Sequence, residues 1–356
     1  MAEIKPLCAV RYGDTAGPLE RLVAPPYDVI SPEERERYAS RSPYNVVHLT
    51  LPDNEAEADR LWRDWRAGGI LVDEDEPGYW WLSQDYVGPD GVARTREGLV
   101  ASLRAEPYER RVVLPHERTH RGPKESRLRL LRAVRAQLEP LFFLYEGQPS
   151  ARRPVRQADL ETDGVHLWRL PPDGIAEAFA DRQLLIADGH HRYETALAYH
   201  EEAGTSESAY LLAVLVSLDD PGLMIFPTHR LLQGVNGPNP THDDVDLAML
   251  DLDKQPADRA RGVLYRRNHR IAMLYGDEGQ LDVELTDALR PQGVSYTASL
   301  EEAVTAVERG DAEGALLVRP TRIQDVYARA REGRVMPQKT TYFYPKLVSG
   351  LLFLPL

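Results

Sequence analysis

The residues best suited to chemistry lie between an apolar run and a helical pattern, in the sequence LLIADGHHRYETA (184–196). Residues 184–187 indicate a buried strand, and residues 193–203 indicate a helix that ends at a glycine. A turn between a strand and a helix N-terminus is a general anion site, because free backbone N–H groups and the helix dipole both favour negative charge. The sequence therefore predicts a phosphate-binding turn over residues 188–192.

Each residue of this turn can take a distinct role. Gly189 lets the backbone approach a ligand closely, and His190 and Arg192 can donate to phosphate oxygens. Asp188, at the carboxyl end of the strand, can hold a metal ion such as Mg²⁺ or accept a proton. His191 can transfer a proton near neutral pH. The simpler alternative is that the aspartate only caps the helix and that both histidines are satisfied polar residues.

Further polar residues could complete the site, although each is more often a surface residue than a ligand when taken singly. The PTHR sequence supplies a donor-rich cluster, and QKTTYFYPK places lysines beside aromatic rings that a base can stack on. The candidates for phosphate or nucleotide binding are Tyr193, Asn45, Thr228, His229, Arg230, Lys339 and Lys346. Nothing in the sequence shows that they converge.

The sequence HERTH (116–120) fits the H-E-x-x-H pattern of zinc proteases. That chemistry needs both histidines on one face of a long helix, and here a proline precedes the motif while Gly-Pro follows it. We therefore expect no zinc. His116, Glu117 and Lys124 remain as more distant pocket residues, with a solvated surface loop as the alternative.

Composition and charge exclude several classes of function. The 356 residues carry a formal net charge of −13, which argues against nucleic-acid binding because such proteins usually need a basic surface. Cys8 is the single cysteine, so the chain has neither an intrachain disulfide nor a cysteine zinc cluster. The sequence contains no apolar run of the roughly 18 residues that a membrane span needs and no N-terminal signal pattern. We expect a cytoplasmic protein without a membrane partner. The oligomeric state stays open.

Alternating strand and helix patterns predict an α/β fold with mixed sheets. Ser31, followed by a proline and two glutamates, predicts the start of a helix. The other expected elements are a strand in NVVHLTL (45–51), a helix at 53–67, a hairpin turning at 89–91, a helix at 124–138, a strand in LFFLYEG (141–147), a short helix at 174–182, a second hairpin turning at 220–222, a helix at 300–309 and a strand at 315–319.

The segment QGVNGPNPTHDD (233–244) has no periodicity and is the best candidate for a linker. It divides the chain into a larger core, residues 1–232, and a smaller α/β lobe, residues 245–356. The chain ends in a segment rich in aromatic residues, which we expect to dock back on the core.

Strand–DGHHR–helix resembles the phosphate-binding box of the ParB and sulfiredoxin superfamily, which includes free-serine kinases. The whole chain resembles the domain-of-unknown-function 1015 family. The residues that carry this likeness are APPYDVIS (24–31), SPYNVVHL (42–49), HERT (116–119), GPKESRLRLL (122–131), IADGHHRYETAL (186–197), FPTHRLL (226–232) and MPQKTTYFYPKLVSGL (336–351). The resemblance implies a ParB/sulfiredoxin-like core with a smaller α/β lobe.

The resemblance also implies roles for single residues. Sulfiredoxins have a cysteine where this chain has His190, so redox chemistry is not expected. ParB proteins bind DNA through a separate helix-turn-helix domain, which this sequence does not show. The serine kinases use the acid and a histidine of the box, which correspond to Asp188 and His191. Their separate catalytic glutamate lies in the N-terminal part, where Asp28 is our candidate.

These considerations favour nucleotide-dependent phosphoryl transfer or hydrolysis, a chemistry that depends on positioning and charge neutralisation. The expected ligand is ATP, ADP or CTP with Mg²⁺, and a small hydroxyl metabolite such as serine is the candidate acceptor. The alternative is a non-catalytic sensor of a nucleotide or a phosphorylated metabolite.

Overall fold

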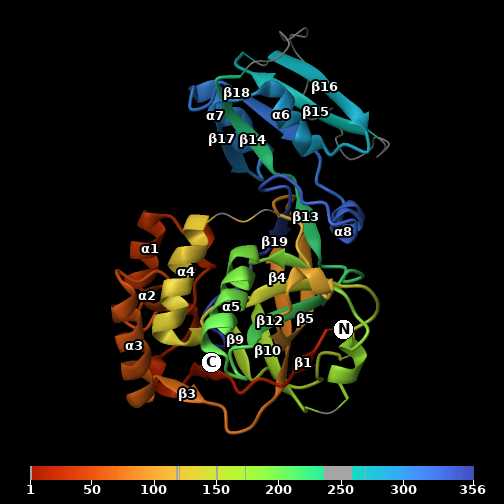
Figure 1. Cartoon of the computed structure of the whole chain (residues 1–356). Coiled ribbons are helices and arrows are strands. Elements are labelled where there is room, and N and C mark those ends of the chain that lie inside the picture. The colour runs from red at the N-terminus through yellow and green to blue at the C-terminus, as the bar shows by residue number, and fades with distance from the viewer. Residues whose placement is uncertain are drawn as a thin grey trace. The chain divides into compact units, whose positions relative to one another are not determined.

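The structure is a computed structural model that describes residues 2–117, 119, 121–149, 151–172, 174–235, 259–268 and 270–356. The chain divides into two compact units. The first unit comprises Met1–Gly88, Ala93–Leu223 and Pro345–Leu356, and the second comprises Pro89–Val92 and Met224–Tyr344. Both contain helices and sheets (Figure 1), so the predicted mixed α/β class is confirmed.

A mixed sheet of nine strands, counted over the described residues, forms the centre of the first unit. Its order is β6-β11-β8-β12-β5-β4-β10-β9, and β1 pairs with β5. The β11–β6 and β12–β8 pairs are parallel, and the other pairs are antiparallel. The strands are β1 (Ile4–Lys5), β4 (Tyr79–Val87), β5 (Ala93–Arg104), β6 (Val113–Leu114), β8 (Leu141–Tyr145), β9 (Leu160–Thr162), β10 (Val165–Leu170), β11 (Leu184–Asp188) and β12 (Tyr210–Ser217).

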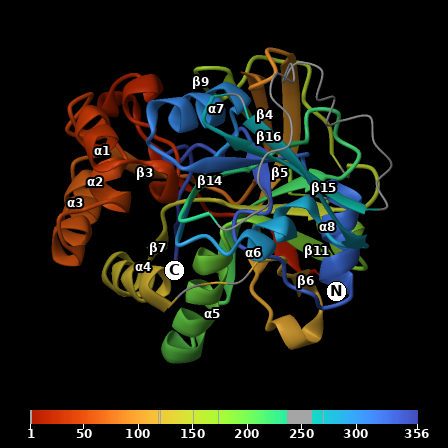
Figure 2. The ribbon, with the colours of Figure 1, turned by 90° about the horizontal axis from the view of Figure 1, so that it is seen from above.

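Helices cover one side of this sheet, and in both views α4 lies between α3 and α5 (Figures 1 and 2). The helices are α1 (Pro32–Ala39), α2 (Val47–Thr50), α3 (Glu55–Ala67), α4 (Arg121–Val134) and α5 (His190–Ala203). One buried core lies around Phe143, Tyr193 and neighbouring strand residues. A second core joins Trp62 and Trp65 of α3 to Leu130 of α4. Two short sheets complete the unit, β2 (Val10–Tyr12) with β3 (Leu71–Asp73) and β7 (Ala136–Gln137) with β20 (Leu354–Pro355).

The second unit has an antiparallel sheet of order β16-β15-β18-β14-β17 and a pair β13-β19. Its strands are β13 (Met224–Phe226), β14 (His229–Gln233), β15 (Arg259–Arg266), β16 (Arg270–Glu278), β17 (Gly293–Thr297), β18 (Gly314–Val318) and β19 (Tyr342–Tyr344). Its helices are α6 (Leu285–Leu289), α7 (Leu300–Arg309) and α8 (Ile323–Arg331). Apolar clusters pack on this sheet around Leu264 and Leu316 and around Val263 and Val307.

Several elements follow the sequence predictions closely. Ser31 caps α1 through a reciprocal bond pattern with Glu34. Helix α3 buries Ala58, Trp62 and Trp65 as its period predicts. Strands β4 and β5 form the first hairpin, and α7 has the predicted bounds.

Other predictions were wrong. The segment 45–51 contains the one-turn helix α2, because the side-chain oxygen of Asn45 accepts from the backbone N–H of Val47 at 3.0 Å and starts a helical turn. A short run rich in apolar residues does not distinguish a strand from a buried turn of helix. The expected second hairpin does not form either, since β12 pairs with β5 and β8 while β13 pairs with β19.

Three boundaries also differ from the predictions. Helix α4 ends at Val134 and is followed by β7, whereas the prediction extended it to residue 138. The predicted helix at 174–182 is the 3₁₀ turn η5 (Ala176–Phe179). Helix α5 begins at His190 and not at Tyr193, so the turn of interest is also the first turn of the helix.

The division into units places Leu232, the predicted end of the core, inside β14 of the second unit. Most of the expected linker, residues 236–244, lies outside the described residues. The final residues, 345–356, belong to the first unit, where Phe353 pairs with Val10 and β20 pairs with β7. Among the helices of the described part, none is both long and apolar enough to cross a membrane.

Candidate functional site

Strand β11 delivers Asp188 to the end of the sheet through an irregularity in its pairing. Leu184, Leu185 and Ile186 are fully buried and pair with β8. The register then shifts, so that Asp188 is the next residue to pair, opposite Phe142. Such bulges redirect side chains at the ends of strands. The bulge therefore sets where the carboxylate of Asp188 lies.

Gly189 joins the strand to α5 and is its N-cap, with φ +102° and no side-chain cap. A Cβ at this position would lie 3.1 Å from Cγ of Leu141 and 3.3 Å from Nη2 of Arg192. Both the left-handed backbone and the close neighbours therefore require glycine. Gly189 has no side chain that could cap the first turn of α5 and occupy the space in front of its N–H groups.

Asp188 is held by two cations from different parts of the chain. Its Oδ2 accepts from Nη2 of Arg192 at 2.9 Å, and its Oδ1 forms an ion pair with Nζ of Lys346. Burial alone would raise the pKa of Asp188, but Lys346 and Arg192 outweigh it and hold this pKa well below its ordinary value. Asp188 is therefore ionised at neutral pH and can accept a hydrogen bond.

Arg192 is buried, and each of its two terminal nitrogens makes a hydrogen bond. Its Nη1 donates to the carbonyl oxygen of Pro140 at 2.7 Å, in addition to the bond with Asp188. Burial lowers the pKa of Arg192, but the carboxylates of Glu139 and Asp188 outweigh it and raise this pKa. In this arrangement Arg192 orients Asp188, and its predicted binding of a phosphate stays a prediction.

His190 and His116 form a buried pair beside the turn. Their rings lie 4.6 Å apart, and Nε2 of His190 accepts from the backbone N–H of His116 at 3.3 Å. Burial lowers the pKa of His116 to about 4 and lowers the pKa of His190 well below its ordinary value. Both imidazoles are neutral at pH 7, and the predicted hydrogen bond from His190 to a phosphate stays a prediction.

The remaining predicted residues of the first unit lie in three different settings. His191 is half-buried in the first turn of α5, where its carbonyl accepts from Thr195. Asp28 is exposed in the turn η3 (Tyr27–Val29), close enough that its charge contributes to raising the pKa of Arg192. Lys124 pairs with Glu194 of α5 at 2.7 Å and so holds α4 to α5.

Two predicted ligands are structural residues. The hydroxyl of Tyr193 donates to the carbonyl of Glu106 at 2.7 Å and accepts its N–H at 2.9 Å, while the fully buried ring packs in the core. The amide of Asn45 is also fully buried and bonds to the carbonyls of Arg21 and Val23 as well as to α2. Their buried polar groups serve the fold.

Thr228, His229, Arg230 and Lys339 belong to the second unit. There Arg230 donates to the carbonyls of Thr228 and Lys339. Burial lowers the pKa of His229 to about 4, and its Nδ1 accepts from the N–H of Val318 at 3.2 Å. The structure groups these four residues with one another, as a cluster of their own unit.

The HERTH segment is not a helix in its described part. His116 and Glu117 lie before the start of α4, and His120 lies outside the described residues. No group of three or more His, Cys, Asp or Glu side chains in the described part of the chain is placed to hold a metal ion. Magnesium prefers oxygen ligands, whereas Asp188 offers one carboxylate that is already paired with two cations. The residues present do not fit a resident Mg²⁺.

Sequence reasoning missed two groups at this end of the sheet. Glu139, which follows β7, is a buried carboxyl whose Oε1 accepts from the N–H of Tyr27 at 2.9 Å and from Ser349 at 3.2 Å. Burial raises the pKa of Glu139, against the opposing charge of Arg192. Arg96 of β5 is also fully buried. Both follow ordinary loop or strand residues, so no local pattern distinguishes them from surface charges.

The family of this chain is shown by its sequence. The profile of a family described as "Protein of unknown function (DUF1015)" matches residues 4–298. The chain belongs to this family. No curated protein matches it.

Several solved structures are similar to this member of the family at low identity. A free serine kinase in complex with AMP is 12% identical, with a TM-score of 0.39 over 65% of this chain and 83% of the kinase. SbnI from Staphylococcus aureus, with a C-terminal truncation, is 10% identical, with a TM-score of 0.41 over 72% of this chain and 87% of SbnI. A conserved hypothetical protein from Pyrococcus furiosus is 13% identical, with a TM-score of 0.37 over 65% and 86%.

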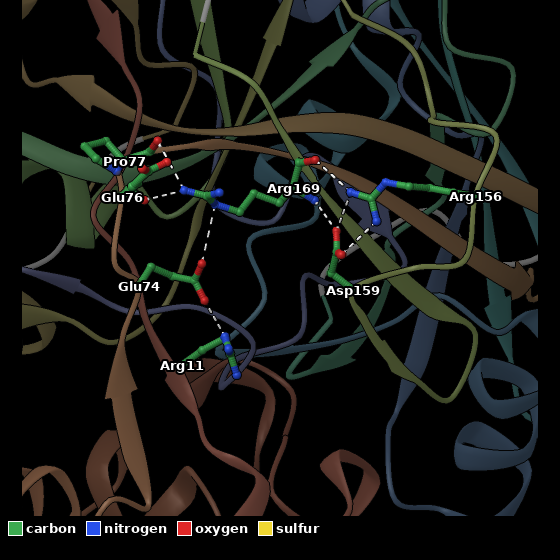
Figure 3. Close-up of polar contacts among 7 residues, drawn as sticks. All are labelled: Arg11, Glu74, Glu76, Pro77, Arg156, Asp159 and Arg169. Atoms are coloured by element: carbon green, nitrogen blue, oxygen red, sulfur yellow. Dashed lines mark hydrogen bonds and ion pairs between the residues drawn. The ribbon is translucent and has the colours of Figure 1, made fainter.

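A separate charged network lies at β10 in the first unit. Figure 3 shows Arg169 between Glu74 and the carbonyl oxygens of Glu76 and Pro77, and it shows Arg156 paired with Asp159. A pocket of about 960 Å³ beside it is lined by both arginines and also by Lys5 and Cys8. Because the guanidiniums of Arg156 and Arg169 are already paired, we interpret this network as structural contacts that hold the loops of the first unit together.

Proposed function

We propose that the first unit binds a phosphorylated ligand, a nucleotide, at the β11–Gly189–α5 turn and transfers or hydrolyses its phosphoryl group. The observation that supports this most is the glycine N-cap of α5 directly beside an ionised, buried carboxylate. The helix N-terminus suits a phosphate, and the carboxylate suits the hydroxyl or water that attacks it.

In this proposal the roles differ from those expected from the sequence alone. The first-turn amides of α5 bind the phosphate, together with the ammonium of Lys346 once its ion pair with Asp188 opens, while Arg192 stays bonded to Pro140 and Asp188. Asp188 orients the attacking hydroxyl, for which a small hydroxyl metabolite such as serine is our candidate. Arg192 positions Asp188. His191 transfers the proton, and Glu139 acts through the charge that it places beside Arg192.

A nucleotide sensor without catalysis is the second candidate function. It is favoured by the ion pair between Asp188 and Lys346, because this pair must open before Lys346 can bind a phosphate. A ligand that competes for Lys346 would release the segment that begins at Pro345. In that case binding, and not turnover, is the useful event.

The variant His191→Ala separates the two functions. We expect it to lose phosphoryl transfer by about 100-fold or more, the usual contribution of an acid–base group, while its affinity for the nucleotide changes little. His166→Ala, on β10, is the matched control and should retain activity. Tight nucleotide binding by the wild type, with no turnover for any acceptor or water, would instead support the sensor.

A further inference from the structure

The guanidinium of Arg96 is buried without enough acceptors. Arg96 is 1% exposed, and Nη2 donates to the side-chain oxygen of Gln84. Within the described part of the chain, its Nε and Nη1 have no hydrogen-bond partner. The group stacks 4.6 Å from the centre of the Phe142 ring. Burial lowers the pKa of Arg96 to about 10, so it still carries its charge at pH 7.

Arg96 lies on the same face of the sheet as Asp188. Asp188 pairs with Phe142, Phe142 with Val214, and Val214 with Val100 of β5, so these four residues form one row across the strands. Alternate residues of a strand share a face, and Arg96 is an even number of positions from Val100. The stacking on Phe142 agrees with this placement.

A chain of contacts also connects Arg96 to the candidate site. Gln84 accepts from Arg96 and donates through Nε2 to the carbonyl oxygen of Lys346 at 3.4 Å. The ammonium of Lys346 in turn pairs with Asp188. Arg96 is therefore connected to Asp188 through Gln84 and Lys346, and Lys346 contacts the carboxyl end of β11.

Within the described part of the chain, the buried guanidinium of Arg96 bonds only to a neutral side chain, that of Gln84. Arg96, Lys346 and Arg192 are three cations near the carboxylate of Asp188, the flanking histidines are neutral at pH 7, and Asp220 acts on Arg96 through its charge but forms no ion pair with it within the described part of the chain. Unpaired buried charge is strongly unfavourable, and a bound anion would compensate it. The carboxylate of Glu139 lies near Arg192, whose pKa it raises.

We propose that Arg96 is a second, buried anion-binding residue of this site and receives an oxyanion, a phosphate or carboxylate group, of the ligand. This inference rests on the proposed function in one respect: both proposals place the ligand at the carboxyl end of β11. It adds that the ligand carries an oxyanion which reaches β5, beyond the phosphate at the α5 turn.

The test uses inorganic phosphate and acetate as probes on the full chain. Calorimetry should show binding of at least one of them to the wild type, and its identity distinguishes a phosphate from a carboxylate. In Arg96→Met the affinity should fall about tenfold or more, as expected for the loss of charged hydrogen bonds. Without anion, Arg96→Met should melt no lower than the wild type, because it replaces an unpaired buried charge by an apolar side chain.

Arg182→Met is the matched control. Its guanidinium also stacks on a ring, 4.4 Å from the centre of Tyr145, but it is only half-buried, and anion affinity should be unchanged. If Arg96→Met fails to fold, Arg96→Lys should weaken anion binding while the protein stays folded. The proposal is overturned if neither anion binds the wild type or if the Arg96 variants bind it equally well.

The outcome is distinguishable from that of the proposed function. A nucleotide that binds and turns over equally in Arg96→Met leaves the proposed function standing and overturns the role of Arg96. Anion binding that depends on Arg96, without binding of any nucleotide, gives the opposite result.

Discussion

At the scale of single residues, Asp188 decides how the turn can act. Its carboxylate contacts two cations, and it is ionised because Lys346 and Arg192 outweigh its burial. A carboxylate held in this way does not serve as a proton donor at neutral pH. It can position a hydroxyl, which is the role that we assign to it.

Removing this charge should leave Arg192 and Lys346 without the carboxylate that both contact. We predict that Asp188→Asn destabilises the first unit by about 3 kcal/mol or more, as for other broken buried pairs. Urea unfolding of the full chain measures this. Asp282→Asn is the matched control, because Asp282 pairs with Arg319 at 2.7 Å in the second unit. Asp282→Asn should destabilise the second unit and leave ligand binding unchanged. Equal effects of Asp188→Asn and Asp282→Asn on ligand binding would contradict the account.

The buried histidines predict how stability depends on pH. Their pKa values are lowered in the folded state, to about 4 for His116 and well below the ordinary value for His190. Between pH 6.5 and 4 the unfolded chain therefore binds more protons than the folded chain. The stability from these neutral rings is full above about pH 6.5, the unfolded pKa, and is lost as the pH falls toward 4.

Thermal melting between pH 7 and pH 4.5 checks this sign. In His116→Asn, whose amide can still donate to the carbonyl of Ile186, the loss of melting temperature on acidification should become smaller. His166→Asn on β10 should keep the wild-type slope. A wild-type chain that melts higher at pH 5 than at pH 7 would be inconsistent with neutral buried rings.

At the scale of elements, α5 carries a left-handed glycine at each end. Gly189 has φ +102° and close neighbours, whereas Gly204 has φ +64° and open space around the missing Cβ. We predict that both alanine variants cost about 1–2 kcal/mol for the left-handed backbone. Gly189→Ala should cost more and should also weaken ligand binding, because its Cβ would press on Arg192. Urea unfolding and ligand titration measure both effects. Equal effects of the two variants would show that the turn at Gly189 has no role in ligand binding.

The same elements show how far sequence reasoning reached. The strand–turn–helix unit was recognisable because an apolar run, a glycine and a helical period are all local signals. The partners of Asp188 were not, since Lys346 lies far along the chain and Arg192 turned out to orient the acid. Glu139 and Arg96 could not be identified from the sequence, because they differ from surface charges only in being buried by the fold. Asn45 and Tyr193 looked like ligands, but tertiary packing uses their polar groups for the fold.

At the scale of the whole molecule, the last residues of the chain complete the first unit. Phe353 is fully buried and makes edge-to-face contacts with Tyr12, at 5.8 Å between ring centres, and with Trp62, at 5.6 Å. We predict that Phe353→Ala destabilises the first unit by about 3–5 kcal/mol, as large-to-small core changes do.

Phe343→Ala is the matched control, because Phe343 is a buried phenylalanine of the second unit. Calorimetric melting should show that each variant lowers a different transition, the first unit for Phe353 and the second for Phe343. A single transition lowered equally by both variants would mean that the two units do not unfold separately.

The central claim is that the β11–Gly189–α5 turn binds a phosphorylated ligand, and a calorimetric titration tests it most directly. ATP, ADP, CTP and phosphoserine are each titrated into the wild type with and without Mg²⁺, and any ligand that binds is repeated with Gly189→Ala and Gly204→Ala. The account predicts that at least one binds and that only Gly189→Ala weakens it, by about tenfold for a loss near 1.4 kcal/mol. It is contradicted if none of the four binds, or if Gly189→Ala binds as well as the wild type.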